Sequence, residues 1–388
     1  MRILHVCICL DTRFGGPSRG LATLATAQAQ RGDQVAVIPS VRTDGQQTLI
    51  SSDRINVITP PIDGTVFGGV AFFNRTLRKV IHQAALQTDI IHIHSTWRYH
   101  LVAAAMIARK LSIPYIVRPA GNLGRATRNS KRWLKRPYFE LVERRIHNRA
   151  AGIHCTSNKE KDEIQELELT SPTFVVTQPV DAASLDTKNP ECPGDRCSWL
   201  KRPGRNVTFL GRISSIKNLE VLLIAFSKVL NSVRDLNLIL AGPHEDQNLV
   251  SKLRQIASDA QIESQLCLPG MLEGEEKHCL LNNTDIFVMP SIHENFGVAV
   301  VEAMHFGVVP IVSTGVGIAD LLLKREAGIV CAPTVEGIAE AMLKALNAEE
   351  SVSADMARSA VAATREFEPS NVANRLNDEY VRAIRNHS

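Results

Sequence analysis

The chain has 388 residues, of which 44% are hydrophobic and 22% are charged, as in ordinary globular proteins. The formal net charge of +4 gives no reason to expect a nucleic-acid partner, and no stretch reaches the roughly 18 apolar residues of a membrane span. The apolar run at the N-terminus is too short for a signal peptide, so we expect a cytoplasmic protein. Six of the eight cysteines lie among apolar residues and are interpreted as reduced core residues. Cys192 and Cys197, in a polar, proline-rich stretch, could bind a metal or cross-link, but no second pair with zinc spacing accompanies them, so a structural or incidental role is favoured.

The first half of the chain repeats an order of strand, turn and helix. Residues 2–10 are predicted to form a buried strand, followed by a glycine-rich turn at 15–20, a helix at 20–31 and a strand at 33–39. These strands are almost continuously apolar, which is typical of a parallel sheet covered by helices on both faces. The order then continues with strands at 90–94, 115–117, 153–155 and 173–176 and a helix at 101–111.

The same order restarts after a proline-rich stretch at 181–204, which we interpret as a linker between domains. The first domain is expected to cover 1–180 and to include a C-terminal helix at about 368–388 that crosses back to it, and the second to cover 205–367. The fold predicted is α/β, with two Rossmann-like, doubly wound domains facing each other across a cleft. The second domain has predicted strands at 206–210, 236–241, 267–269, 285–289 and 309–313 and helices at 219–230 and 249–260.

Two carboxylates, Glu294 and Glu302, stand on either side of Gly297, where a helix is predicted to begin. Backbone N–H groups at the start of a helix favour phosphate, and carboxylates beside them favour hydroxyl groups. A nucleotide sugar carries both kinds of group. An interpretation without function is that Glu294 is an N-terminal helix charge that complements the helix dipole.

A basic loop follows the first strand of the second domain, with Gly211, Arg212 and Lys217 in order. Ligands of open α/β sheets bind at the carboxyl ends of the strands, where this loop is expected. A guanidinium group can bind two phosphate oxygens at once and an ammonium group adds a point charge, so the pair suits a diphosphate. A solvated basic loop is the alternative.

Taken together, Gly211, Arg212, Lys217, Glu294 and Glu302 resemble in their order the retaining glycosyltransferases of family 4, which have the GT-B fold. The resemblance covers nearly the whole chain and is to the bacterial type that builds exopolysaccharides and glycolipids. It implies a retaining, metal-independent enzyme without a cofactor, which transfers a hexose, with glucose favoured, from a UDP-sugar to a glycan or lipid-linked glycan.

The resemblance also implies roles for single residues. Arg212 and Lys217 would hold the donor diphosphate and act in catalysis with Glu294, which faces the donor sugar, while Glu302 would bind the ribose hydroxyls. The other donor-binding residues that it implies are Gly15, Gly16, Gly211, Pro243, Met271, Asn295, Phe296, Gly297 and Val298.

One position departs from the family pattern. Members often have a histidine that contacts the donor sugar where this chain has Ala120. The role of that imidazole is then absent or supplied by Asn122, Arg118 or His94, and His94 and Asn122 are also candidates for the acceptor site. Two alternatives to a transferase stay open: a sugar-nucleotide binding protein with little or no activity, and a nucleotide-sugar epimerase of the GT-B fold.

The segment 125–149 is strongly basic, with nine Lys or Arg residues against two Glu. It also carries Trp133, Leu134 and Tyr138 at roughly helical spacing, although Pro137 excludes one unbroken helix. A basic amphipathic segment of this kind can lie on an anionic leaflet, so we expect a peripheral association with the inner face of the membrane. The alternative is a surface helix whose aromatic residues pack on their own domain.

Overall fold

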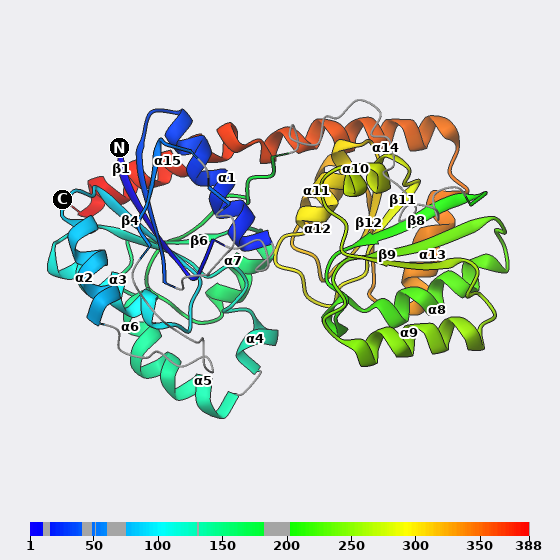
Figure 1. Ribbon diagram of the computed structural model, residues 1–388, viewed down its shortest axis with the longest axis horizontal. Helices are drawn as coiled ribbons and strands as arrows, with labels where there is room; N and C mark the ends of the chain where they lie inside the picture. Colours follow the sequence, from blue (N-terminus) through cyan, green and yellow to red (C-terminus); the bar gives the residue numbers. More distant parts are fainter. Residues whose placement is uncertain are drawn as a thin grey trace. The chain divides into compact units, whose positions relative to one another are not determined.

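A computed structural model of the chain describes residues 1–10, 16–40, 49–50, 52–59, 75–129, 132–181 and 202–387. The chain divides into two compact units, Met1–Val180 with Glu368–Ser388, and Asp181–Phe367 (Figure 1). Most of the expected linker at 181–204, with Cys192 and Cys197, lies outside the described residues.

The first unit is built on a seven-stranded parallel sheet with the order β3-β2-β1-β4-β5-β6-β7. The order reverses between β1 and β4, as in doubly wound folds. Its strands are β1 (Arg2–Cys7), β2 (Gln34–Pro39), β3 (Ile55–Val57), β4 (Ile90–His94), β5 (Tyr115–Arg118), β6 (Gly152–Cys155) and β7 (Thr173–Val175). Its main helices are α1 (Gly16–Gln30), α2 (Arg75–Ala85), α3 (Tyr99–Lys110), α7 (Asn158–Gln165) and α15 (Pro369–His387).

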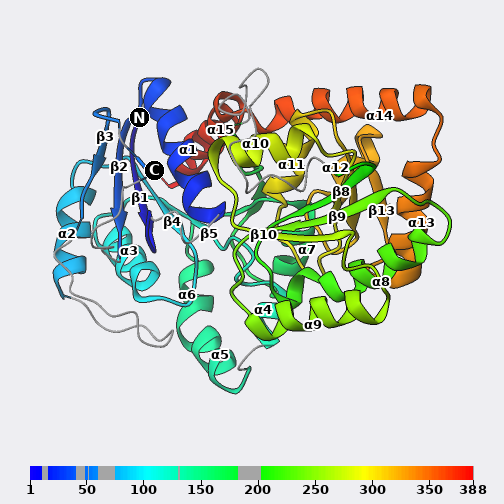
Figure 2. The same ribbon diagram turned by 45° about the vertical axis from the view of Figure 1, so that its right-hand side comes forward.

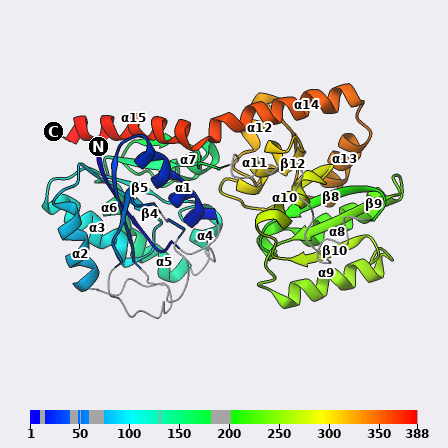
Figure 3. The same cartoon turned by 45° about the horizontal axis from the view of Figure 1, so that its top comes forward.

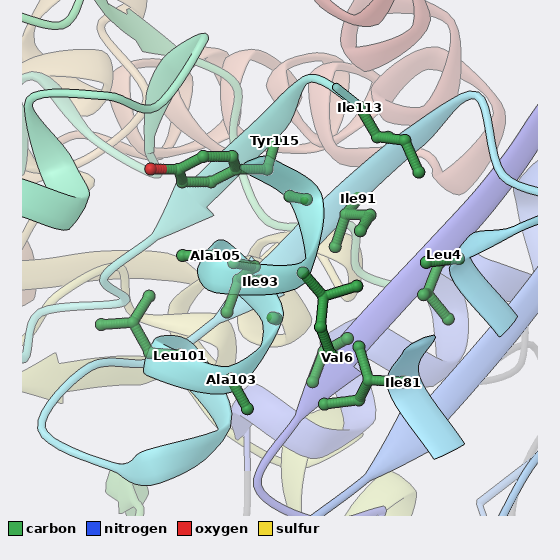
Figure 4. Packing of buried hydrophobic residues seen from close by; sticks show 14 of the residues in the cluster. Leu4, Val6, Ile81, Ile91, Ile93, Leu101, Ala103, Ala105, Ile113 and Tyr115 are labelled. Atoms are coloured by element: carbon green, nitrogen blue, oxygen red, sulfur yellow. The ribbon is translucent and has the colours of Figure 1, made fainter. Parts of the chain in front are cut away.

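The two faces of this sheet are covered by different material. On one face, residues such as Leu4 and Ile93 pack with α2 and α3 into an apolar core (Figure 4). On the other face α1 and α15 lie side by side (Figure 3). Side chains alternate between the two faces along a strand, so in β4 the histidines lie on the face opposite to Ile91 and Ile93. Apolar contacts with Val372 and Leu376 of α15 hold the C-terminal helix on this face.

One local prediction needs correction and another is confirmed. The first helix begins at Gly16 rather than near residue 20, because Pro17 is tolerated in the first turn, where its missing N–H would have no partner anyway. The basic segment folds as α4 (Arg125–Asn129), α5 (Arg132–Tyr138), a π-helical turn (Phe139–Glu143) and α6 (Arg144–His147). The π turn follows Pro137 directly, and the prediction that this segment is not one regular helix is confirmed.

The second unit repeats the architecture with a six-stranded parallel sheet of order β10-β9-β8-β11-β12-β13. Helices α8 and α9 lie on one face of it and α11 and α12 on the other (Figure 2). The strands are β8 (Arg205–Leu210), β9 (Leu236–Ala241), β10 (Leu266–Gly270), β11 (Ile286–Met289), β12 (Val309–Ser313) and β13 (Ile329–Cys331). The helices are α8 (Leu219–Leu230), α9 (Gln247–Asp259), α10 (Gly274–Asn282), α11 (Val298–His305), α12 (Ala319–Arg325), α13 (Val335–Leu346) and α14 (Glu350–Ala363).

The predicted fold class of two Rossmann-like, doubly wound α/β domains is therefore confirmed. Among the described residues, no helix is both long and apolar enough to span a bilayer. Among the described cysteines, Cys7, Cys9, Cys155, Cys267 and Cys331 form no disulfide bond, as predicted. Cys279 is disulfide-bonded, so the prediction of a reduced thiol is wrong there.

Candidate active site

The first loop of the candidate site joins β8 to α8 and carries the two predicted diphosphate-binding cations. It runs along the loop after β9, because Ile213 donates its backbone N–H to the carbonyl of Pro243 at 3.0 Å. The two loops touch so closely that a Cβ atom on Gly242 would lie 1.8 Å from the carbonyl oxygen of Gly211. A glycine is therefore required at position 242.

The cations of this loop lie in different environments. Lys217 ends a short 3-10 turn and is buried, whereas Arg212 is exposed and pairs with Glu245 at 3.3 Å. Asn218, in the left-handed conformation with φ of 59°, donates its side-chain N–H groups to the carbonyls of Pro290 and Pro333. This clamp ties the first loop to the loops that follow β11 and β13.

The second loop joins β11 to α11 and carries Glu294. Its backbone is paired like a strand: Glu294 donates its N–H to the carbonyl of Gly315 at 3.0 Å and accepts from the N–H of Gly317 at 2.9 Å. A Cβ atom on Gly315 would lie 2.3 Å from the carbonyl oxygen of Ser291, so the close approach needs this glycine too. The position of Glu294 is thus set by backbone contacts rather than by a flexible loop.

Two Lys–Glu ion pairs bring the predicted residues together at this edge of the sheet. Lys217 pairs with Glu294, and Lys277 on α10 pairs with Glu302 on α11 at 2.9 Å. The side chains are 11% and 23% exposed in the first pair and 11% and 15% in the second. Because these charges are largely removed from water, removal of one partner leaves an uncompensated buried charge, which in general costs about 3–5 kcal/mol.

The start of α11 lies between the two pairs and offers groups that suit an anion. Gly297 precedes the helix with φ of 103°, and the N–H groups at its first turn are the ones that a helix leaves without internal partners. Nearby, the side-chain oxygens of Ser214 and Ser291 and Nε2 of His244 are buried without a partner among the described residues. A ligand with phosphate and hydroxyl groups would satisfy polar atoms of this kind.

The remaining predicted donor-binding residues fall in two places. Asn295, Phe296, Gly297 and Val298 lead directly into α11, with Phe296 buried against the core. Pro243 and Met271 follow β9 and β10, and the side chain of Met271 is 43% exposed. In the first unit Gly16 opens α1, while Gly15 lies outside the described residues.

The two acceptor candidates lie at the carboxyl edge of the first unit's sheet. His94 is the last residue of β4, and Asn122 follows β5, where it donates to the hydroxyl of Ser95 at 2.8 Å. Trp97 donates its indole N–H to the carbonyl of Asn122 at 2.7 Å. Ser95, Trp97 and Ala120 all have positive φ, at 75°, 65° and 53°, a strained conformation for residues other than glycine. Strain of this kind concentrates at functional sites.

Two buried glutamates, Glu143 and Glu160, support this edge, and neither was identified from the sequence. Glu143 accepts a hydrogen bond from the backbone N–H of Trp97, and burial raises the pKa of Glu143 to about 8. Glu160 accepts from the backbone N–H of Gly121 at 2.6 Å and from Thr156. They fix the backbone around the strained positions. Neither stands in a recognisable motif, because each acts through a loop distant in sequence.

Lys277 is the residue of the second unit that sequence reasoning missed. It stands in a run of charged residues at the start of α10, which looks like an ordinary solvent-exposed helix end. Its partner Glu302 is 25 positions further on, so only the packing of α10 against α11 reveals the pair.

Comparison with known proteins identifies both units. Residues 15–179 match the family model described as a glycosyl transferase 4-like domain, and residues 199–363 match glycosyl transferases group 1. A 2-deoxystreptamine glucosyltransferase of Streptomyces kanamyceticus is 24% identical over 81% of this chain and 84% of its own. A GDP-mannose:cellobiosyl-diphosphopolyprenol alpha-mannosyltransferase of Xanthomonas oryzae is 25% identical over 81% and 78%.

Solved structures agree on the fold. The Anabaena protein HepE, in complex with UDP and glucose, superposes with a TM-score of 0.74 over 97% of this chain and 98% of its own, at 19% identity. A sucrose-phosphate synthase of Thermosynechococcus elongatus gives a TM-score of 0.75 over 98% of both chains, at 16% identity. With two family models that together span most of the sequence, the chain belongs to the family 4 glycosyltransferases of the GT-B fold.

Proposed function

We propose that this glycosyltransferase moves a hexose, with glucose favoured, from a UDP-sugar to a glycan or lipid-linked glycan of polysaccharide biosynthesis, with retention and without a metal ion. The observation that carries the proposal is the pair of Lys–Glu ion pairs on either side of the start of α11. In these pairs the carboxylates, which suit sugar hydroxyl groups, lie beside cations and helix N–H groups, which suit phosphate. Ligands of such folds bind where the strand order reverses, which in this sheet is between β8 and β11.

The proposed roles divide the donor among these groups. Arg212, Lys217 and the first N–H groups of α11 hold the diphosphate, Glu302 accepts hydrogen bonds from the ribose, and Glu294 accepts them from the hexose. In the absence of donor, Lys217 and Glu294 neutralise each other. Binding of a diphosphate gives Lys217 a second anion, so the carboxylate of Glu294 becomes available to the sugar hydroxyls.

The charge that develops in the reaction is negative on the departing diphosphate. Cations and N–H groups already oriented toward it lower the barrier, because they need no rearrangement during bond breaking. Arg212 and Lys217 provide that positive charge from side chains, and this supports a mechanism without a metal ion. The UDP complex of HepE supports uridine as the base, whereas the Xanthomonas relative makes GDP-mannose the main competing donor.

The donor assignment is tested by thermal stabilisation with a panel of nucleoside diphosphates and their sugars, since a ligand that binds only the folded state raises its stability. UDP and UDP-glucose are expected to raise the melting temperature at millimolar concentration. A shift with GDP-mannose and none with UDP would overturn the uridine assignment.

Activity is tested by slow release of free sugar from UDP-glucose. Glu294→Ala and Arg212→Ala should abolish the release, and Lys252→Ala, an exposed cation on α9, is a control that should leave it unchanged. Stabilisation by the donor without any release would favour a binding protein. Conversion of the donor into another nucleotide sugar would favour an epimerase.

We further propose that the segment 125–149 holds the protein on an anionic membrane surface at the cytoplasmic face. The aromatic residues of this segment differ in exposure, because Phe139 is buried while Trp133 is 80% exposed. Exposed Leu134 and Leu141 and the exposed cation Arg136 accompany Trp133. Apolar side chains among cations suit the boundary between lipid head groups and acyl chains.

Liposome co-sedimentation tests this surface. Arg136→Glu with Trp133→Ala should weaken binding to vesicles with anionic lipid, and added salt should do the same. Lys135 is a poor choice for charge reversal because it donates to the carbonyl of Thr127 and lies over the ring of Trp97. Lys252→Glu is the control. Equal binding to neutral vesicles would contradict the electrostatic part of the proposal.

A further inference from the structure

Four buried histidines lie together on the face of the first unit's sheet that α1 and α15 cover. They are His5 on β1, His92 and His94 on β4 and His154 on β6, and the ring centres of His92 and His94 are 4.2 Å apart. Gln28 of α1 and Tyr380 of α15 are hydrogen-bonded to members of this group. These six side chains make one connected network, whose protons can be assigned.

The assignment starts at a group that can only accept. Nε2 of His154 lies 2.7 Å from the carbonyl oxygen of Val176, so it must carry the proton, and Nδ1 of neutral His154 must be an acceptor. Nε2 of His92, 3.3 Å away, therefore donates to it. Nδ1 of His92 is then an acceptor, and the hydroxyl of Tyr380 at 2.7 Å must donate to it.

The remaining members follow in turn. Because the only hydroxyl proton of Tyr380 is used, its oxygen accepts from the amide N–H of Gln28 at 3.4 Å, which turns the amide oxygen of Gln28 toward His5. Nε2 of His5 donates to that oxygen at 2.7 Å, so its Nδ1 is an acceptor. Nε2 of His94 donates to it at 2.9 Å. The chain runs in one direction from His94 to Val176.

The four histidines of this hydrogen-bonded chain are neutral at pH 7. Burial lowers the pKa of His5 to about 4 and of His154 to about 3, and it lowers the pKa of His92 and His94 well below the ordinary value. The buried guanidinium of Arg118 acts in the same direction on each of them.

The same nitrogens raise the question of a metal ion. His5, His92 and His94 offer nitrogens that lie within 4.8 Å of one another. A metal ion would need a lone pair from each of the three rings, but Nε2 of each ring carries a proton in the network, and the Nδ1 lone pairs of His5 and His92 accept hydrogen bonds. The ion would also lie close to the positive charge of Arg118. The geometry therefore favours hydrogen bonds over a metal centre.

The direction of these hydrogen bonds determines whether Nδ1 of His94 is a hydrogen-bond donor or an acceptor. With the proton on Nε2, Nδ1 carries a lone pair, and it has no hydrogen-bond partner among the described residues. His94 ends β4 and keeps 7% of its surface exposed, at the edge where Asn122 and the strained residues lie. We propose that Nδ1 of His94 accepts a hydrogen bond from the attacking hydroxyl of the acceptor, and that the chain from Val176 through Tyr380 holds His94 in the tautomer that can do so.

In this role His94 orients the hydroxyl and does not deprotonate it, because an imidazole with so low a pKa is a weak base. His5, Gln28, His92, His154 and Tyr380 are positioning residues. The role assigned to His94 rests on the proposed transferase function. The tautomers do not, so the two are tested separately.

Nitrogen-15 NMR of histidine-labelled protein at pH 7 tests the tautomers. The four histidines of the chain are expected to carry the proton on Nε2. His147 provides an internal contrast, because it donates from Nδ1 to the carbonyl of Glu143 and should show the opposite tautomer. A proton on Nδ1 of His94, or one equivalent of zinc retained by the purified protein, would overturn the chain.

Two substitutions of His94 test the role. In His94→Gln the amide lies where Nε2 was, so the bond to His5 survives and the outward acceptor is lost; in His94→Asn the amide lies near Nδ1. With UDP-glucose as donor and water as the attacking hydroxyl, His94→Gln should lower sugar release at least tenfold, and His94→Asn should restore part of it. Stabilisation by UDP-glucose should stay as in the wild type for both.

Ile93→Val, on the opposite face of β4, is the control for a general loss of stability, and its rate of release should match the wild type. Unchanged release in His94→Gln, or equal losses in both His94 variants, would overturn the role of His94. If UDP-glucose neither stabilises the wild type nor releases sugar, the proposed donor is wrong, and the tautomer measurement still decides on the chain.

Discussion

Acidification should unfold the first unit at a pH where most proteins are still stable. Burial lowers the pKa of six histidines there, and each takes up a proton only when the unit unfolds. Their stabilising contribution is complete above the ordinary histidine pKa of 6.5 and is lost as the pH falls from 6.5 toward 4. The six are His5, His92, His94, His100, His147 and His154.

The size of the effect follows from proton linkage. Between pH 7 and pH 5, a histidine that stays neutral in the folded state and has the ordinary pKa when unfolded costs about 2 kcal/mol. Six such groups together cost on the order of 10 kcal/mol. Glu143 acts in the opposite sense because its pKa is raised to about 8, and it returns about 2–3 kcal/mol. The net loss of unfolding free energy is comparable to the whole stability of a typical domain, about 5–15 kcal/mol.

Urea unfolding at several pH values measures this loss. Trp97 and Trp133 lie in the first unit, so in a Trp199→Phe background the fluorescence transition reports on that unit. His147→Asn removes one titrating group and should reduce the loss between pH 7 and 5 by about 2 kcal/mol. The control Ile93→Val removes no titrating group and should leave this loss unchanged. An unfolding free energy at pH 5 within about 2 kcal/mol of its value at pH 7 would refute the reasoning.

Three further predictions concern single contacts. Glu302→Gln should weaken UDP binding about tenfold in calorimetry but leave binding of 2′,3′-dideoxy-UDP unchanged, because the proposed partners of the lost carboxylate are the ribose hydroxyls; equal losses for both ligands would contradict its proposed role. Gly242→Ala should destabilise the second unit by more than the roughly 1–2 kcal/mol expected for Gly32→Ala, since position 32 has positive φ but open space, whereas a Cβ at 242 would meet the Gly211 carbonyl at 1.8 Å; urea unfolding compares the two. Glu143→Gln should gain stability relative to the wild type as the pH rises from 5 to 8, because the wild-type carboxyl group stays protonated in the folded state and ionises on unfolding; parallel pH profiles would show that the pKa of Glu143 is not raised by folding.

Much of the architecture was predictable because parallel strands buried on both faces are continuously apolar. Elements were missed where this signal is weak. The strands β3 and β13 have only three residues each, and α2 is an amphipathic helix with many polar residues. The start of α1 was misplaced because Gly16 and Pro17 read equally well as a turn.

The proposed donor-binding residues stand out in the sequence to the extent that motif order carries them. Glu294, Glu302 and Lys217 stand in a recognisable sequence, and the structure brings each into an ion pair at one edge of the sheet. The period-two alternation of His92 and His94 in β4 was visible as well, but it does not reveal a network. Their connection depends on Tyr380, which is 288 positions from His92, and no local pattern records such a contact.

The attachment of α15 to the first unit has a consequence for biosynthesis. Tyr380 and its apolar neighbours on α15 complete one face of a sheet whose strands are made first, yet they leave the ribosome after the whole of the second unit. At about 5–20 residues per second, the buried histidines would wait some ten seconds or more for their cover. The second unit, continuous in sequence, can mature in that interval, so the domain translated first is the one that finishes folding last.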